Sequence, residues 1–268
     1  MTHGGPAPTF RPALTTAVLG RPLRHYPIAV TTEALALAWA RREDAPEGAT
    51  VVADQEISPR QRKGPPWVGF STRGLYLSVV LRPGLPPEGE GLLWLLASLG
   101  AAEGLEAVVG APVSLKWPDD VLAGGGKIAG VKVDAQLGPG QIQTAIVTFR
   151  INVNVERPDL PADLGGRATS VAIETGAPVT REAVLDAVLG AFERRYDDDV
   201  PALLDGYRAR CESLGRSVRA LLLPRGEVTG TAVDVDAFGA LLVDGGGAPT
   251  AVAVDVLKKL EYLVTSGS

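Results

Sequence analysis

The sequence predicts an α/β (α+β) fold in two parts: a mixed β-sheet covered by helices over residues 24–212, and a small SH3-like β-barrel over residues 213–268. In the first part, apolar runs of helical length alternate with strand-length runs that end at glycine-rich turns. From Gly215 onward the pattern changes to short alternating strands, which suits a small barrel. Residues 1–23 contain many prolines and are expected to form a flexible N-terminal segment.

Each expected element follows from its hydrophobic period and from the residues at its ends. Thr31 and Thr32 are suitable N-caps for a helix that Arg41 and Arg42 close. Further helices are expected at 91–106, 180–195 and 200–211; strands of the main sheet at 24–30, 51–53, 75–81, 113–117, 127–136 and 141–154; and barrel strands at 218–223, 227–234, 240–244 and 251–256.

Composition excludes several classes of function. The chain has 268 residues with a net charge of −5, so the basic face on which nucleic-acid affinity depends is not expected. No run of about 18 uncharged apolar residues occurs, and the N-terminus has no signal-peptide pattern, so we expect a cytoplasmic protein outside the membrane. One cysteine, Cys211, and two histidines, His3 and His25, leave no material for a zinc cluster and little for a Ser-His-Asp site.

Lys127 is the residue that points most directly to a ligand. It opens an apolar strand directly after the turn Gly124–Gly126 and follows an acidic turn that ends at Asp119 and Asp120. Burying an ammonium group costs several kcal/mol unless an anion meets it, so this position predicts a carboxylate or phosphate nearby. The glycine turn lacks the Ser/Thr and the helix of a phosphate-binding loop and is expected to be a hairpin turn.

These residues resemble the motifs of biotin protein ligases. Lys116–Asp120 and Lys127–Gly130 are similar to the family's K-W-P-N-D turn and K-[IL]-A-G strand. Residues 53–67 resemble its A-D-x-Q-T-x-G-R-G-R-x-G-R-x-W loop, Ile151–Asn154 its G-[IL]-G-[IL]-N-[VI]-N strand, and residues 167–170 its A-[TS]-S helix entry. The order holds from about residue 24 to residue 259, which is typical of the form without an N-terminal DNA-binding domain.

The resemblance implies a reaction in two steps. ATP, with Mg²⁺, activates the carboxylate of biotin or a related acid as an acyl-adenylate, and a lysine amine of a biotin carboxyl carrier domain then takes the acyl group. Catalysis would depend on Lys127, which contacts the acid and the α-phosphate, and on Arg60 and Arg62, which contact the phosphates. From composition alone, Arg60, Arg62 and Lys63 would instead be a solvated surface loop.

The resemblance also implies two sets of binding residues. Trp67 would pack near the adenine, although tryptophan is more usually a core residue. Asp120 would bind Mg²⁺ or hold the loop, although a plain turn aspartate explains this position equally well. The ATP-binding set is Trp67, Asp119, Asp120 and Asn152, and the acid-binding set is Thr31, Thr32, Glu33, Glu56, Gly130 and Arg150.

Several positions depart from the family pattern, most of them in the acid-binding pocket. Arg150 stands where the family has a glycine, Glu56 where it has glutamine and Glu33 where it has asparagine; the other departures are Pro59, Gln61, Pro65 and Asp119. The new carboxylates and the new cation would form an internal ion pair, or would recognise an acid that carries an ammonium group. A ligase for another acid and a non-catalytic binding protein are therefore the alternatives to biotin ligation, and the oligomeric state stays open between monomer and homodimer.

Overall fold

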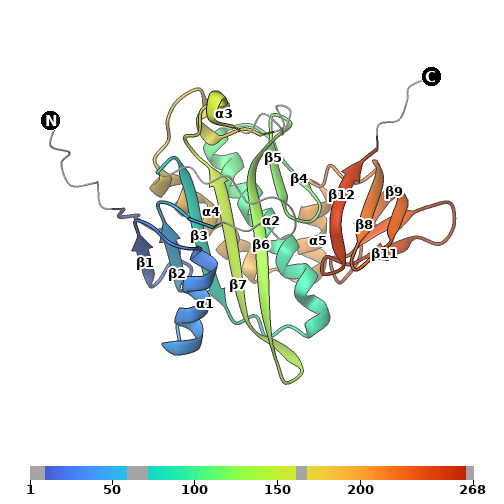
Figure 1. Cartoon of the computed structure of the whole chain (residues 1–268), viewed down its shortest axis with the longest axis horizontal. Helices are drawn as coiled ribbons and strands as arrows, with labels where there is room; N and C mark the ends of the chain where they lie inside the picture. The colour runs from blue at the N-terminus through green and yellow to red at the C-terminus, as the bar shows by residue number, and fades with distance from the viewer. Residues whose placement is uncertain (1–9, 59–71, 161–167, 264–268) are drawn as a thin grey trace.

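The computed structural model describes residues 10–58, 72–160 and 168–263. The main sheet has seven strands in the order β1-β2-β3-β7-β6-β5-β4, and a second sheet has five strands in the order β11-β10-β9-β8-β12 (Figure 1). The main-sheet strands are β1 (Leu23–Tyr26), β2 (Thr50–Ala53), β3 (Gly74–Leu81), β4 (Val113–Lys116), β5 (Asp120–Ala123), β6 (Gly126–Gly138) and β7 (Gln141–Asn152). The second sheet consists of β8 (Ser217–Leu222), β9 (Glu227–Val235), β10 (Leu241–Asp244), β11 (Thr250–Val252) and β12 (Leu257–Tyr262).

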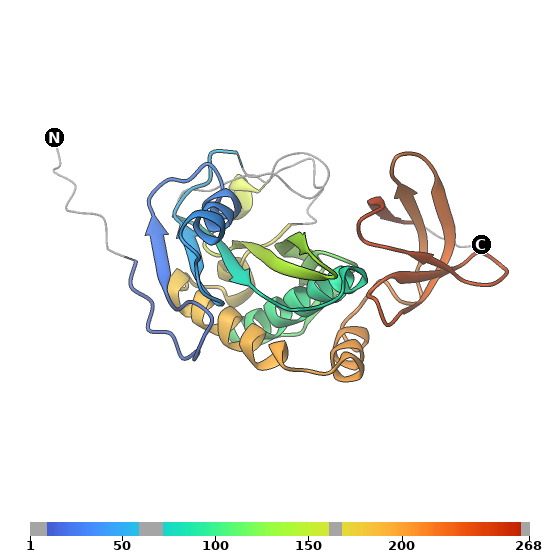
Figure 2. The ribbon, with the colours of Figure 1, turned by 90° about the horizontal axis from the view of Figure 1, so that it is seen from below.

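The helices lie on both sides of the main sheet. Helix α1 (Thr32–Arg42) covers one face, and α2 (Glu90–Val109) and α4 (Arg181–Tyr196) cover the other (Figure 2). Shorter helices are α3 (Val171–Thr175), α5 (Val200–Arg208), η1 (Pro87–Gly89) and η2 (Arg157–Asp159). The mixed α/β class that the sequence predicts is confirmed.

The main core lies between the sheet and the pair α2 and α4. Alternate residues of a strand point to opposite faces, and Leu77 and Phe149 are among those that point toward these helices. The Phe149 and Phe192 rings meet edge to face, with centroids 5.4 Å apart. By length and composition the segment Pro87–Val109 could cross a membrane, but 72% of its most apolar window is buried inside the protein, as expected for a core helix.

The structure differs from the predicted elements in three places. Residues 120–123 form strand β5, which was not predicted, because they pair with β4 and β6 on either side. Strand β12 was not predicted; its Lys258 and Lys259 interrupt the apolar pattern and are exposed, while Leu257 and Leu260 are buried. Strand β1 ends at Tyr26, and the chain beyond it makes a single bridge from Ala29 to Glu56.

Trp117 joins the two sheets. Its indole Nε1 donates to the carbonyl oxygen of Gly239 at 3.0 Å, and its backbone nitrogen donates to Ser213 Oγ at 3.0 Å. Close by, the start of α2 touches the loop before β10, since a Cβ on Gly91 would lie 2.2 Å from the carbonyl oxygen of Phe238. The C-terminal sheet is therefore fixed against the main sheet beside the acidic turn at 119–120.

The Trp117 bond predicts a loss of stability on substitution. Trp117→Phe removes the only donor of the ring and leaves the Gly239 carbonyl without it, so the free energy of unfolding should fall by about 1–3 kcal/mol. Urea denaturation measures the change. Trp94→Phe is the comparison, because the Trp94 indole Nε1 donates at 3.4 Å to Glu90 of its own helix; an equal loss in both variants would contradict the role given to the Gly239 bond.

Candidate active site

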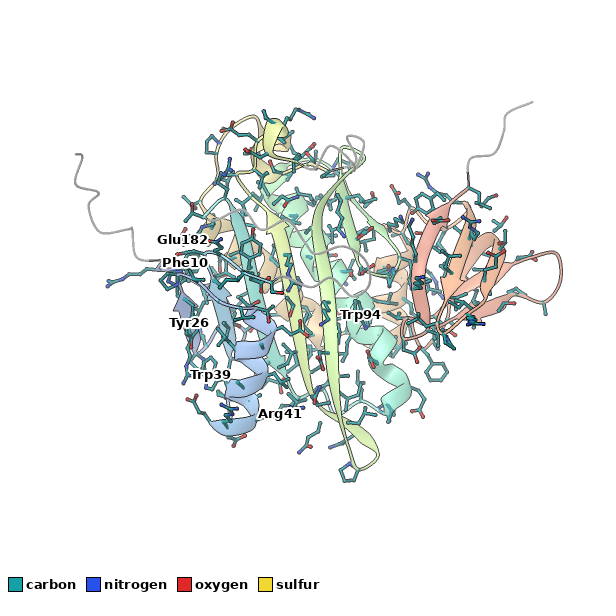
Figure 3. All side chains as sticks on the ribbon, viewed as in Figure 1. Phe10, Tyr26, Trp39, Arg41, Trp94 and Glu182 are labelled. Atoms are coloured by element: carbon teal, nitrogen blue, oxygen red, sulfur yellow. The ribbon has the colours of Figure 1, made fainter. Side chains whose placement is uncertain are left out.

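Over residues 76–80 of β3 and 146–150 of β7, the second face of the main sheet has an apolar half under α1 and a polar half beyond the N-terminus of that helix. Val80 and Ile146 on this face are covered by Trp39 of α1, whose place beside Tyr26 is seen in Figure 3. Further along the same strands, Ser78 pairs in register with Thr148, and Tyr76 pairs with Arg150. The helix therefore covers the apolar half, and the polar half lies beyond its N-terminus.

Glu56 is the centre of the polar half. Its Oε1 accepts hydrogen bonds from the backbone nitrogen of Thr32 at 2.6 Å and from Thr32 Oγ1 at 2.8 Å. Thr32 is the first residue of α1, so the carboxylate lies at the positive end of the helix dipole. Thr31 serves as the N-cap and accepts from Ala34 N at 3.0 Å. The helix start and the segment around Glu56 thus hold each other in place.

A chain of hydroxyl groups ends on this carboxylate. Thr32 Oγ1 gives its proton to Glu56, and Ser78 Oγ donates to Thr32 Oγ1 at 2.9 Å. Ser78 has one hydroxyl proton, so in its 2.8 Å bond with Thr148 it is the acceptor and Thr148 is the donor. The hydroxyl protons of Thr148, Ser78 and Thr32 are therefore all directed along the chain toward Glu56. Neither Ser78 nor Thr148 was predicted as a site residue, although a hydroxyl within an apolar strand is the signal that marks each of them.

Arg150 completes the group around Glu56. Its Nε donates to Glu56 Oε2 at 2.7 Å, and the two side chains are 4% and 0% exposed. The second new carboxylate, Glu33, forms an ion pair with Lys132 of β6. Both carboxylates therefore have a cation of this chain as partner, which favours the internal ion pair over recognition of a ligand ammonium group. Glu33 is not part of the Glu56 group.

Lys127 lies at the end of the sheet and forms an ion pair with Asp120. Burial lowers the pKa of Lys127, but the negative charges of Asp120 and Asp119 outweigh it, so the pKa is raised and the lysine stays protonated at neutral pH. The turn at 124–126 is a hairpin between β5 and β6, as expected from the sequence. The anion that the sequence predicts beside Lys127 is thus supplied, without a ligand, by the acidic turn.

Asn152 reaches the same end of the sheet from β7. Its Nδ2 donates to the carbonyl oxygen of Thr169 at 2.9 Å, and the backbone nitrogen of Thr169 donates to the carbonyl oxygen of Lys127 at 3.0 Å. Gly130 pairs in register with both Asp120 and Arg150, so it connects the Lys127 group with the Glu56 group. The structure therefore brings the predicted residues of β5, β6 and β7 to one polar surface.

Other predictions fall outside what the structure describes. Arg60, Arg62 and Trp67 belong to residues 59–71, which are not among the described residues. Within the described ranges, no three His, Cys, Asp or Glu side chains come together as a metal-binding group. Asp120, the predicted Mg²⁺ residue, contacts Lys127.

Known protein families and relatives match most of this chain. Residues 29–152 match the biotin/lipoate A/B protein ligase family, and residues 213–257 match the biotin protein ligase C terminal domain. The chain is 32% identical over 239 residues to the bifunctional ligase/repressor BirA of Bacillus subtilis, covering 88% of this chain and 73% of that protein. It is 30% identical over 214 residues to the biotin--[acetyl-CoA-carboxylase] ligase of Mycobacterium tuberculosis, covering 77% of each chain.

A solved structure extends the likeness to the fold. The biotin protein ligase from Aquifex aeolicus in complex with biotin and ATP superposes with a TM-score of 0.73 at 27% identity, covering 90% of this chain and 99% of that one. The fold and both sequence matches define a ligase domain followed by its C-terminal domain. The chain belongs to the biotin protein ligase family.

The Glu56 and Arg150 pair predicts a large effect on stability. Glu56→Ala leaves the Arg150 guanidinium buried without its anion and should lower the free energy of unfolding by about 3–5 kcal/mol. Urea denaturation of the two proteins tests this. Glu43→Ala is the control, because Glu43 pairs with Arg24 at an exposed position and its loss should have no measurable effect. Equal stability of Glu56→Ala and wild type would show that the buried pair is absent in solution.

Proposed function

We propose that this protein is an ATP-dependent biotin--protein ligase. It joins biotin and ATP into biotinyl-AMP and pyrophosphate, and then transfers the biotinyl group to a lysine amine of the biotin carboxyl carrier domain of acetyl-CoA carboxylase. Support comes from the family membership, from relatives named as biotin--[acetyl-CoA-carboxylase] ligases, and from the likeness to a ligase solved with biotin and ATP. The observation that carries the proposal is the protonated, partly buried Lys127 at the end of the sheet.

The chemistry explains why such a lysine is needed. In the first step a carboxylate oxygen attacks the α-phosphorus of ATP, and pyrophosphate leaves with the electrons of the broken P–O bond. Two anions approach in this step, so a fixed cation between them stabilises the transition state. Lys127 is such a cation, because Asp120 holds its ammonium group in place before any ligand arrives. In the second step the acceptor amine attacks the carbonyl carbon and AMP leaves.

The remaining roles are proposed from the family pattern. Arg60 and Arg62 would bind the phosphates, and Trp67 would pack near the adenine. Mg²⁺ is commonly held by one or two carboxylates together with the substrate phosphates. Asp120 is the candidate carboxylate, but its contact with Lys127 supports the second predicted role, that of holding the site together. A cytoplasmic location stays a prediction, and the oligomeric state stays open between monomer and homodimer.

Lys127→Ala should abolish most adenylate formation while leaving the fold intact. ATP–pyrophosphate exchange in the presence of biotin should fall roughly a hundredfold or more, on the order of 3 kcal/mol, as when one preorganised charge stabiliser is deleted. Lys259→Ala is the control, since it also removes a lysine paired with a carboxylate, Glu261, but on the C-terminal sheet. Exchange should then fall less than about threefold, and a similar loss in both variants would contradict the specific role of Lys127.

The acidic chain should not bind duplex DNA specifically. Affinity for DNA depends on basic side chains that neutralise phosphates, whereas the net charge here is −5. Gel shift at moderate salt should show no more than weak, non-specific association. A nanomolar complex with an operator would contradict this prediction, which separates the protein from relatives named ligase/repressor.

A further inference from the structure

Arg150 has a buried donor that the described part of the chain leaves without a hydrogen-bond partner. Its Nε is bonded to Glu56, but its Nη2 is buried and has no hydrogen-bond partner among the described residues. An unsatisfied buried donor costs free energy, and more so when it belongs to a charged group. Such a group in a native structure calls for an explanation, and a bound ligand is one that the position of Arg150 supports.

The position is inside the proposed active site. Arg150 lies in register with Gly130, the glycine that also pairs with Asp120, the partner of Lys127. The positive charge of Arg150 also acts on Lys127, since it opposes the raised pKa of that lysine. The two cations therefore share one site: Lys127 is placed for the carboxylate of the acid, and Arg150 lies further along the same face of the sheet.

We propose that Arg150 Nη2 donates a hydrogen bond to a neutral carbonyl oxygen on the acid substrate, and that this bond makes Arg150 a specificity-determining residue. The inference rests on the proposed ligase function and deepens it. Biotin is an acid of this class, because its ring carries a ureido carbonyl at the end opposite the carboxylate. A plain fatty acid has no such oxygen.

The charges around Arg150 favour a neutral oxygen over an anionic one. Glu56 already neutralises the guanidinium through a contact of 2.7 Å, and both side chains are almost completely buried. A second carboxylate on the ligand would lie close to Glu56, and two like charges at short range in a buried site repel strongly. A carbonyl oxygen accepts the same hydrogen bond without this repulsion. The ligand ammonium alternative is not favoured, because Glu56 is already fully engaged by Thr32 and Arg150.

The experiment measures acid selectivity with the full-length chain. ATP–pyrophosphate exchange and calorimetric binding are compared for three acids: biotin, octanoate, which lacks a second acceptor, and azelate, which carries a second carboxylate. For the wild type we expect biotin to be preferred over both other acids by about tenfold or more, the range for one hydrogen bond to a charged donor.

Two variants isolate the donor. Arg150→Met removes the guanidinium donor but leaves Glu56 buried without a cation. The folding of this variant is therefore checked by thermal unfolding. Arg150→Met combined with Glu56→Gln removes both charges and keeps an acceptor oxygen for Thr32. In the double variant the preference for biotin over octanoate should shrink by about tenfold or more. Arg219→Met, on the exposed Arg219–Glu261 pair of the C-terminal sheet, should keep the wild-type preference.

The outcomes separate the two proposals. If no acid supports exchange with wild type, the ligase function fails, and calorimetry still decides whether Arg150 selects biotin. If wild type uses or binds biotin no better than octanoate, or prefers azelate, the neutral-oxygen proposal is overturned and the ligase function stands on its exchange activity. If the double variant binds biotin more tightly than wild type does, Arg150 blocks the pocket, which would falsify its role as a donor.

Discussion

The buried carboxylate of Glu56 is the group around which the polar face of the sheet is organised. A charge in this position is stable only when its oxygens are hydrogen-bonded and a cation neutralises it. Thr32 supplies two donors from the start of α1, and Arg150 supplies the cation from β7. The carboxylate therefore fixes the helix terminus, the segment after β2 and the central strand relative to one another, and these are the elements of the proposed acid-binding end of the site.

The two faces of the main sheet have different roles: one forms the apolar core, and the other carries the polar side chains of the site. The face against α2 and α4 is apolar and supplies most of the buried core, so the opposite face can carry hydroxyl groups and charges without loss of the fold. Helix α1 covers only the apolar half of that second face, through Trp39 and its neighbours. The polar half, with Ser78, Thr148 and Arg150, is thereby left for chemistry on a rigid strand surface, which holds side chains more closely than a loop would.

Both cations of the site are held by carboxylates of the chain itself. Lys127 contacts Asp120, and Arg150 contacts Glu56, so neither ammonium nor guanidinium has to be reoriented from solvent when a ligand binds. The two pairs differ in exposure. The Lys127 pair is partly exposed, whereas the Arg150 pair is almost fully buried and its Nη2 has no partner among the described residues. This difference is consistent with one cation for catalysis and one for recognition.

The sequence by itself determined the α/β class and the approximate ranges of the long elements. It also contained the motifs, with Lys127, Asp120 and Asn152, that are typical of this family. Both are short-range signals, carried by the hydrophobic period and by local motifs. It left two roles open for Glu33 and Glu56: an internal ion pair, or recognition of an ammonium group on the acid. Only the tertiary structure decided that Glu56 pairs with Arg150, 94 residues away, and that Glu33 pairs with Lys132. Strand β5 was likewise decided by its neighbours β4 and β6. The physical reason is the same in each case: the partner of a buried charge or of a short strand is chosen by the packing of distant segments, which no local pattern records.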